Sequence, residues 1–264
     1  MDIRDSVVLV TGGARGIGEG IARYFAARGA KVAVVDQDQE GVDRVVAEIR
    51  GAGGDAIGVQ ANVASEADTA RFIKATLDAY GKLNVAIACA GIIRDGTLVS
   101  LDKKTGKVSK KLGLDKWQPV IDINLTGTFL TLRDAAEAMI NTGSNGLLVT
   151  ISSVNKEGQV GQLNYSSTKA ADALMPKIIV GEFQMRGIHN IRCIGIAPGY
   201  TATPMLTGMN QDALKMILND VQIGRLVLPD EIASLIGHCV ENEAIDATTL
   251  EITGGLCYPM GIAK

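Results

Sequence analysis

The sequence of 264 residues predicts a single α/β domain, residues 1–264, with a doubly wound parallel sheet of about seven strands and helices on both faces. Short apolar runs alternate along the chain with longer stretches in which apolar residues recur at helical spacing. Hydrophobic residues make up 47% of the chain and glycines number 31, which suits strands and helices that pack closely. Parallel strands need crossover connections, so this alternation also predicts right-handed crossovers.

Seven runs have the length and apolar character of buried strands: Val7–Val10, Lys31–Val35, Ala56–Val59, Leu83–Ala88, Leu147–Ile151, Ile191–Ile196 and Thr249–Ile252. Six stretches between them have the amphipathic period of helices: Ile17–Arg28, Gln39–Gly51, Glu66–Tyr80, Trp117–Ile140, Ser167–Arg186 and Pro229–Asn242. Ligands of such sheets bind beyond the carboxyl ends of the strands, and site residues are expected there.

Two segments depart from this alternation of strands and helices. Residues 95–116 contain two short alternating stretches around a turn with glycine, which predicts an inserted hairpin. Its five lysines, at 103, 104, 107, 110 and 111, are typical of a solvated face, and a docking surface is the alternative. Residues 201–223 have the apolar character of a substrate lid, although packing within helices explains them equally well.

Composition narrows the class of partner. A formal charge of -3 gives no general attraction to nucleic acid or to an anionic membrane, so the expected partner is a small molecule. The four cysteines lack the spacing of a zinc site, and no metal is expected. No signal-like segment opens the chain and no run of about 18 apolar residues occurs, which predicts a soluble, cytoplasmic protein.

The turn after the first strand has the residues of a nucleotide site. It carries Gly12, Arg15, Gly16, Ile17 and Gly18 between a strand and an amphipathic helix. Glycines let the backbone approach a pyrophosphate, whose charge the helix N-terminus attracts. Mere packing of the turn is the alternative, but the strand and helix around it favour a Rossmann-type dinucleotide site.

Asp36 follows the second strand, about 20 residues beyond the glycines, where a carboxylate binds ribose hydroxyls and repels a 2′-phosphate. Arg15 has the opposite preference because a guanidinium attracts such a phosphate. An exposed arginine can swing away, whereas repulsion at a close site is hard to avoid. NAD is therefore favoured over NADP.

Tyr165 and Lys169 are four residues apart, an offset that places both on one face of a helix. A phenol has a pKa of about 10 and needs a nearby cation to act as a base near neutrality. With Ser152 or Ser153 holding an oxygen, the pair would exchange a proton with an alcohol while a hydride moves elsewhere. A chance surface pair is the alternative for the two residues alone.

Together with Ala90-Gly91, Asn124, Ser152-Ser153 and Pro198-Gly199, these motifs occur in an order that resembles the classical short-chain dehydrogenase/reductase family over essentially the whole chain. The resemblance implies that Tyr165 is the acid/base, that Lys169 supports it and binds ribose, and that Asn124 holds a relay water. The family's usual spacing selects Ser152 as the ligand of the substrate oxygen, but the Ile-Ser-Ser strand ending favours Ser153, which is our choice.

The resemblance also implies further cofactor contacts, at Asn62, Val63, Ala90, Gly91, Pro198, Gly199, Thr201 and Thr203, and a homotetramer. The function expected is NAD-dependent interconversion of a small or aromatic secondary alcohol and its ketone. A reductase of 3-oxoacyl thioesters, carried on acyl carrier protein or coenzyme A, is one alternative. A non-catalytic nucleotide-sensing protein is the other, and retention of all four catalytic-type residues disfavours it.

Overall fold

The central sheet of the protein has seven strands, all parallel, in the order β3-β2-β1-β4-β7-β8-β9. The computed structural model describes residues 1–208 and 210–256. The strands are β1 Val7–Thr11, β2 Lys31–Asp36, β3 Asp55–Gln60, β4 Val85–Ala88, β7 Gly146–Ile151, β8 Ile191–Pro198 and β9 Thr248–Ile252. This arrangement confirms the α/β fold that the sequence predicts.

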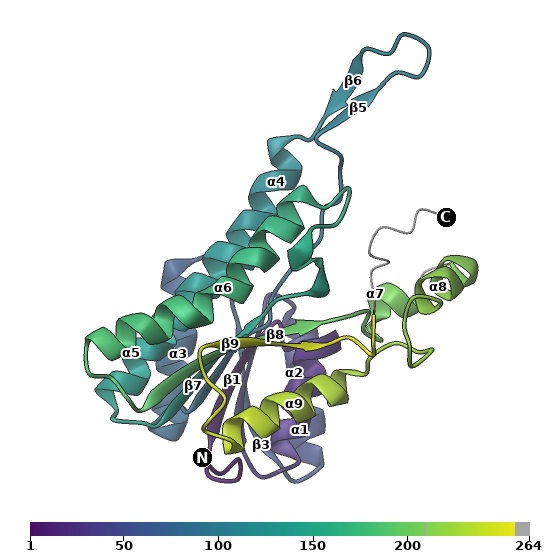
Figure 1. Ribbon diagram of the computed structural model, residues 1–264. Helices are drawn as coiled ribbons and strands as arrows, with labels where there is room; N and C mark the ends of the chain where they lie inside the picture. The colour runs from purple at the N-terminus through teal and green to yellow at the C-terminus, as the bar shows by residue number, and fades with distance from the viewer. Residues whose placement is uncertain (209, 257–264) are drawn as a thin grey trace.

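Helices cover both faces of the sheet (Figure 1). One layer holds α1 Gly16–Ala26, α2 Gln39–Gly51 and α9 Pro229–Glu241, and the other holds α3 Glu66–Tyr80, α5 Gly127–Asn141 and α6 Leu163–Met185. Successive residues of a strand point to opposite faces, so β1 serves both cores: Val8 and Val10 pack in one, Val7 and Leu9 in the other. Burial on both faces explains why the strands read as continuous apolar runs.

The helix expected at Trp117–Ile140 is not one continuous α-helix. It consists of α4 Leu114–Val120, a π-helical turn Ile121–Thr126 and then α5. A π turn closes its hydrogen bonds one residue further along than an α turn, and it leaves the 3.6-residue apolar period too little changed to be seen in the sequence. The expected boundary at Ser167 is also wrong, because α6 begins at Leu163.

Helix α6 carries a proline, and the sheet compensates for it. Pro176 lacks the N–H that would bond the carbonyl of Asp172 four residues earlier. The Thr150 hydroxyl on β7 donates to that carbonyl at 2.8 Å instead. Two further hydroxyls from the strand side, of Ser152 and Thr249, donate to the carbonyls of Lys169 and Ala173. These bonds fix the depth of α6 over the sheet.

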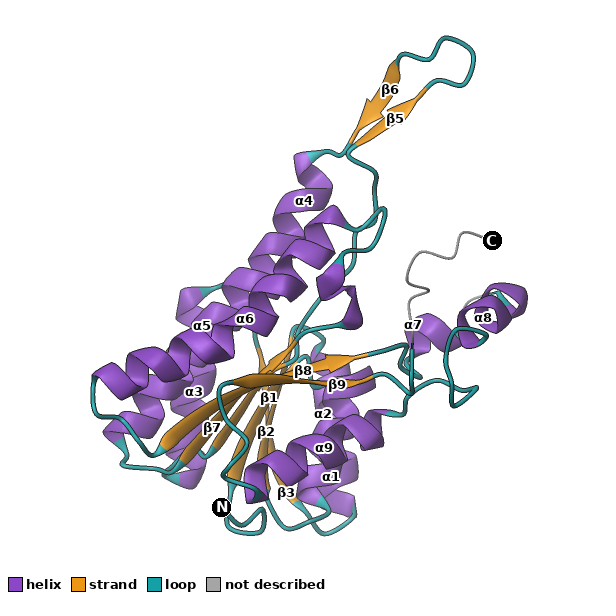
Figure 2. Cartoon of the chain, viewed as in Figure 1, coloured by secondary structure: helices purple, strands orange, loops and turns teal. Residues whose placement is uncertain are grey.

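Residues 99–111 project from the body as a hairpin of β5 Val99–Leu101 and antiparallel β6 Val108–Lys111 (Figure 2). The Asp102 carboxylate accepts hydrogen bonds from the amides of Lys104 and Thr105 and so shapes the turn. Residues 201–223 contain two short helices, α7 Pro204–Thr207 and α8 Gln211–Leu218, and residue 209 between them lies outside the described part. In the described ranges, no helix combines the length and hydrophobicity needed to cross a membrane.

The bond between Thr150 and the Asp172 carbonyl gives a stability prediction. Replacing Thr150→Val keeps the shape and removes the donor, which leaves a buried carbonyl unpaired. The free energy of unfolding is expected to fall by about 1–3 kcal/mol. In a Pro176→Ala background the residue 176 amide supplies a donor, so the same replacement should cost clearly less. Chemical denaturation of the four proteins measures both costs, and equal costs in the two backgrounds would show that Pro176 has no part in the bond.

Candidate functional site

The glycine turn after β1 lies directly against the end of β4. Gly12 has a φ of +67°, and a Cβ there would lie 2.8 Å from the Cα of Ala90. The Thr11 hydroxyl accepts hydrogen bonds from the amides of Cys89 and Ala90 at 3.1 and 3.3 Å. Only glycine fits at position 12, and the contact brings the turn and the Ala90-Gly91 segment to the same edge of the sheet.

Helix α1 begins in close backbone contact with this glycine turn. A Cβ at Gly18 would lie 2.1 Å from the Gly12 carbonyl oxygen, and Gly16, with a φ of +60°, faces the Thr203 side chain. Arg15 occupies the N-cap position, and no side chain caps the first amides of the helix. A helix N-terminus with uncapped amides behind a glycine turn has the chemistry of an anion site. Ile17 packs against the core below it.

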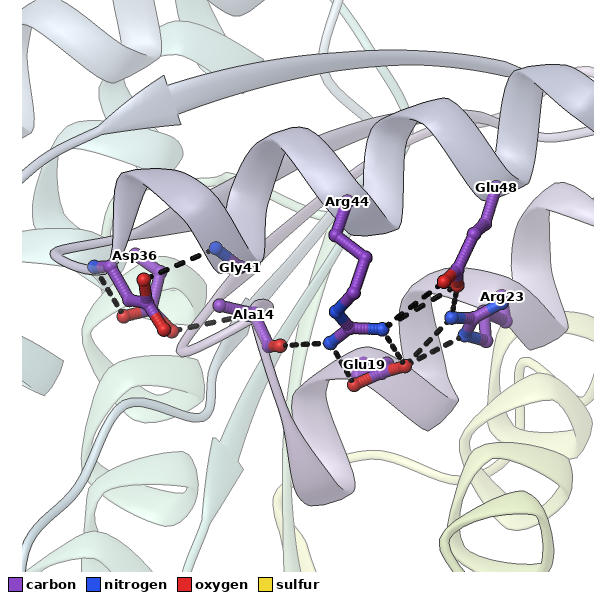
Figure 3. A network of polar contacts seen from close by, with 8 residues as sticks. Ala14, Glu19, Arg23, Asp36, Gly41, Arg44 and Glu48 are labelled. Atoms are coloured by element: carbon purple, nitrogen blue, oxygen red, sulfur yellow. Dashed lines mark hydrogen bonds and ion pairs between the residues drawn. The ribbon is translucent and has the colours of Figure 1, made fainter.

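Asp36 ends β2 and faces the glycine turn (Figure 3). Its Oδ2 accepts a hydrogen bond from the Ala14 amide and its Oδ1 one from the Asp38 amide, both at 3.1 Å. The two bonds fix the carboxylate between the first and second βα turns. A carboxylate in this place can accept further bonds from hydroxyl groups, as expected for a ribose site.

An ion-pair network behind the turn holds it in place, and the sequence did not reveal it. Arg44 of α2 donates to the Ala14 carbonyl oxygen and to Glu19 Oε2 of α1, each at 2.8 Å (Figure 3). Arg23 and Glu48 extend the network. The hydrogen bond from Arg44 is the main cause that lowers the pKa of Glu19. Arg44 thus ties the turn to the neighbouring helix.

Tyr165 and Lys169 lie on the first turns of α6, above the ends of β4 and β7. The Lys169 Nζ atom is 5.7 Å from the centroid of the Tyr165 ring. It donates to the Ile151 carbonyl oxygen at 2.6 Å and to Asp172 Oδ2 at 2.9 Å, and its side chain is only 7% exposed. Burial acts to lower the pKa of Lys169, but its neighbours, first the Asp172 carboxylate and then Tyr165, together outweigh burial, and the pKa lies above its ordinary value.

Asn124 lies in the π-helical turn and is fully buried. Its Oδ1 accepts from the Ile92 amide at 2.8 Å and its Nδ2 donates to the Ile92 carbonyl at 3.0 Å. A Cβ added to Gly91 would lie 3.5 Å from Asn124 Oδ1 and 3.9 Å from Lys169 Nζ, so these three residues meet. The wider π turn places this side chain under the loop that follows β4.

The structure separates the two serines at the end of β7. Ser152 donates its hydroxyl to the Lys169 carbonyl oxygen at 2.6 Å, so it faces α6 and serves the packing of that helix. Ser153 accepts from the Asn155 amide at 3.1 Å and caps the short 3₁₀ helix Val154–Glu157. Of the two hydroxyls, only that of Ser152 is recorded as donating its proton to a carbonyl of α6.

The remaining sequence-predicted contacts lie at other strand ends. Asn62 bends back on its own loop, accepting from the Ala64 amide, and Val63 packs against Gly127. Pro198 ends β8. Gly199 is pressed against Thr253, and buried Thr201 donates to the Gly199 carbonyl. Thr203 lies at the glycine turn, against Gly16. For the other side chains, no bond to Tyr165 or Lys169 is recorded among the described residues.

Sequence reasoning missed two buried polar residues of α6, Asp172 and Asn164. Asn164 Nδ2 donates to the carbonyls of Arg94 and Lys116, both at 3.0 Å, and so clasps the two ends of the inserted segment beside Tyr165. In the sequence, the only sign of a role for Asn164 is its position next to Tyr165. A hollow lies between that segment and the loop before α6, lined by Asp95, Gly96, Thr97, Asn155, Gln159, Val160, Gly161, Gln162 and Tyr200.

Residues 6–214 match the family model described as short chain dehydrogenase. The chain belongs to this short-chain dehydrogenase family. Its relatives include a 3-oxoacyl-[acyl-carrier-protein] reductase of Synechocystis sp., 36% identical over 95% of this chain and 96% of the relative. The (3R)-3-hydroxyacyl-CoA dehydrogenase of Homo sapiens is 33% identical over 96% of each chain. The 2,5-dichloro-2,5-cyclohexadiene-1,4-diol dehydrogenase LinX of Sphingobium indicum is 34% identical over 94% of this chain and 95% of the relative.

Membership of the short-chain dehydrogenase family makes the protein an oxidoreductase that uses a nicotinamide cofactor. The family match covers the glycine turn, the π-helical turn and the first turns of α6 within one stretch of chain. Among the described residues, no group of histidine, cysteine and acidic side chains could hold a metal ion.

The crowding at Gly12 predicts an effect on dinucleotide affinity. Gly12→Ala places a Cβ where Ala90 lies and forces an L-residue to a positive φ, at a cost of about 1–2 kcal/mol. NADH affinity, measured by fluorescence titration, should fall roughly tenfold or more. Gly51→Ala is the matched control, since open space surrounds that glycine at the end of α2. Unchanged affinity in a folded Gly12→Ala protein would dissociate the turn from nucleotide binding.

Proposed function

We propose that the protein is an NAD-dependent oxidoreductase that interconverts 3-hydroxyacyl and 3-oxoacyl thioesters. The observation that carries this proposal is the pair of full-length relatives named for such thioesters, a 3-oxoacyl reductase and a 3-hydroxyacyl dehydrogenase. A 3-hydroxyacyl group is itself a secondary alcohol, so the proposal narrows the expectation from the sequence. It also moves the preference from a small or aromatic alcohol to the thioester alternative.

The cofactor site fits a dinucleotide. The turn at Gly12 and Gly18 has no room for a Cβ, and the first amides of α1 have no side-chain cap. Asp36 is held with its oxygens between two βα turns, where a carboxylate favours ribose hydroxyls over a 2′-phosphate. These features support NAD as the cofactor. The cofactor contacts expected at Arg15, Asn62 and Thr203 belong to the same proposal. When bound, the nicotinamide supplies or accepts the hydride.

Proton transfer is assigned to Tyr165. In ketone reduction its hydroxyl gives a proton to the carbonyl oxygen, and in alcohol oxidation it takes the proton back. Ser153 holds the substrate oxygen, because Ser152 is already bonded to α6. The Lys169 ammonium provides positive charge beside the phenol and is kept charged by its buried partners. Asn124 braces the loop after β4 beneath this group.

Turnover tests the assignment of Tyr165. Purified protein is expected to oxidise NADH with acetoacetyl-CoA, and Tyr165→Phe should lower kcat by a factor on the order of a thousand, because the proton donor is lost. NADH affinity should stay within about twofold of the wild type. Tyr80→Phe is the matched control, since that hydroxyl bonds Asp55 at the start of β3, the opposite end of the strands from the candidate site. Turnover by Tyr165→Phe at the wild-type rate would refute the role.

Cofactor choice is tested at Asp36. Asp36→Ala removes the carboxylate that repels a 2′-phosphate, so the ratio of kcat/KM for NADH to that for NADPH should fall at least about tenfold, near 1.4 kcal/mol. Asp43→Ala, an exposed acid on the neighbouring α2, is the control for charge alone. A wild-type protein that prefers NADPH, or an unchanged ratio in Asp36→Ala, would contradict the assignment of NAD.

A second candidate is the oxidation of a ring-borne secondary alcohol, favoured by the similarity to the cyclohexadiene-diol dehydrogenase. Rates on acetoacetyl-CoA, on an acetoacetyl carrier protein and on cyclic alcohols separate the candidates. A carrier protein bound through the lysines of the hairpin would show a KM that rises with salt. NADH binding without turnover on the whole panel would leave the nucleotide-sensing alternative.

The homotetramer also stays a proposal. Large apolar side chains of α5 and α6 are exposed in the single chain, at Phe129, Ile140, Leu174, Ile178 and Met185. Such residues support burial against other copies of the chain. Light scattering on the purified protein gives the number of copies directly.

A further inference from the structure

Asp172 is a buried carboxylate that the proposed reaction leaves without a role. It lies on α6, three residues after Lys169, and has no exposed surface. Its Oδ2 is 2.9 Å from Lys169 Nζ, so a fully buried charge is paired with the lysine that supports the acid/base tyrosine. Replacing a buried ion pair by apolar residues of similar size is often neutral or stabilising, so stability alone does not account for this pair.

The other oxygen of the carboxylate is unpaired. Asp172 Oδ1 has no hydrogen-bond partner, a rare state for a buried polar atom. Burial raises the pKa of Asp172, while Lys169 and then the nearby Thr128 hydroxyl act against it. That hydroxyl, however, has a single proton and donates it to the Asn124 carbonyl at 2.7 Å. Lys169 is therefore the one strong partner of this carboxylate.

The surroundings of Lys169 contain few other titratable groups. On α6 these are Tyr165 and Asp172, and on the loop after β4 there is Cys89. Burial raises the pKa of Cys89 to about 12, so the thiol is neutral. From β7 the neighbour is the Ile151 carbonyl, and from the π-helical turn it is the neutral Asn124. Of the groups recorded as acting on Lys169, Asp172 is the only one whose carboxylate accepts a hydrogen bond from the ammonium.

A paired ammonium acts on its neighbours differently from a bare one. Two of the three N–H groups of Lys169 are bonded to fixed acceptors, which holds Nζ at its place below the Tyr165 ring. The anion 2.9 Å from Nζ cancels part of the positive potential that the ammonium produces at Tyr165, whose ring centroid is 5.7 Å from Nζ. A weaker potential favours the neutral phenol over the phenolate.

We propose that Asp172 is a positioning residue that fixes the Lys169 ammonium and weakens its field at Tyr165, so that the tyrosine is held as the proton donor needed to reduce a ketone. This inference rests on the proposed function. It gives the chain a built-in preference, near neutral pH, for the reduction direction over the oxidation direction.

The test is the pH profile of Asp172→Asn. Asparagine keeps an oxygen for Lys169 and can donate to the Thr128 hydroxyl, so the fold should hold. The variant also loses an anion that helps to keep Lys169 protonated, so the titration of Lys169 is followed in it as well. With Lys169 protonated, oxidation of 3-hydroxybutyryl-CoA with NAD should reach half of its maximal rate at a pH lower by about one unit than in the wild type. Loss of the Lys169 proton in the variant near neutral pH would overturn the proposal. An unchanged profile, or a shift to higher pH, would overturn the proposal. If the variant does not fold, Asp172→Ser removes the same charge, and the same shift of the pH profile is expected of it.

Asp134→Asn is the matched control, because it removes another buried aspartate that pairs with a neighbouring cation, Arg133, away from Tyr165. Its profile should match the wild type. A wild-type protein without thioester turnover would refute the proposed function and not this inference. In that case the role of Asp172 is tested by the absorbance of the Tyr165 phenolate, which is assigned by subtracting the spectrum of Tyr165→Phe. This absorbance should appear at lower pH in Asp172→Asn than in the wild type. Its appearance at the same or higher pH would refute the role of Asp172.

Discussion

A buried positive charge is the constraint on which the rest of this site depends. The Lys169 ammonium lies almost out of reach of solvent, and an unpaired charge in such a place would cost several kcal/mol. The Ile151 carbonyl and the Asp172 carboxylate each accept a hydrogen bond from this ammonium. Because one acceptor ends β7 and the other belongs to α6, the charge is stable only where that strand end and that helix are held in register.

The fold supplies this register through hydroxyl groups on the strands. Thr150, Ser152 and Thr249 all donate to carbonyl oxygens of α6 within one turn of Lys169, and one of those carbonyls is available because Pro176 cannot bond it. At the neighbouring strand ends, glycines let the first βα turn approach the end of β4. Catalytic and cofactor-binding candidates thus come from separate elements that meet at the carboxyl ends of the strands, as expected for a doubly wound sheet.

The sequence was sufficient wherever the information is local and periodic. Apolar runs located all seven strands of the main sheet, and the glycine turn, Asp36 and the Tyr165–Lys169 pair stand where their spacing put them. It was insufficient where a partner is distant in sequence or lies in an irregular turn. The π turn that buries Asn124, the bond that commits Ser152 to α6 and the clasp made by Asn164 leave no period to detect. Asp172 falls within the stretch expected as an amphipathic helix, and only packing shows that it is buried.

The most direct measurement of the central claim is the titration of the Lys169 side chain by nitrogen NMR in protein with labelled lysines, the signal being assigned by its loss in Lys169→Met. The ion pair with Asp172 acts against burial, so the pKa of Lys169 should lie above the ordinary value of a lysine side chain. A Lys169 signal that titrates below that ordinary value would show that burial prevails, and would contradict an ion pair as the basis of the site.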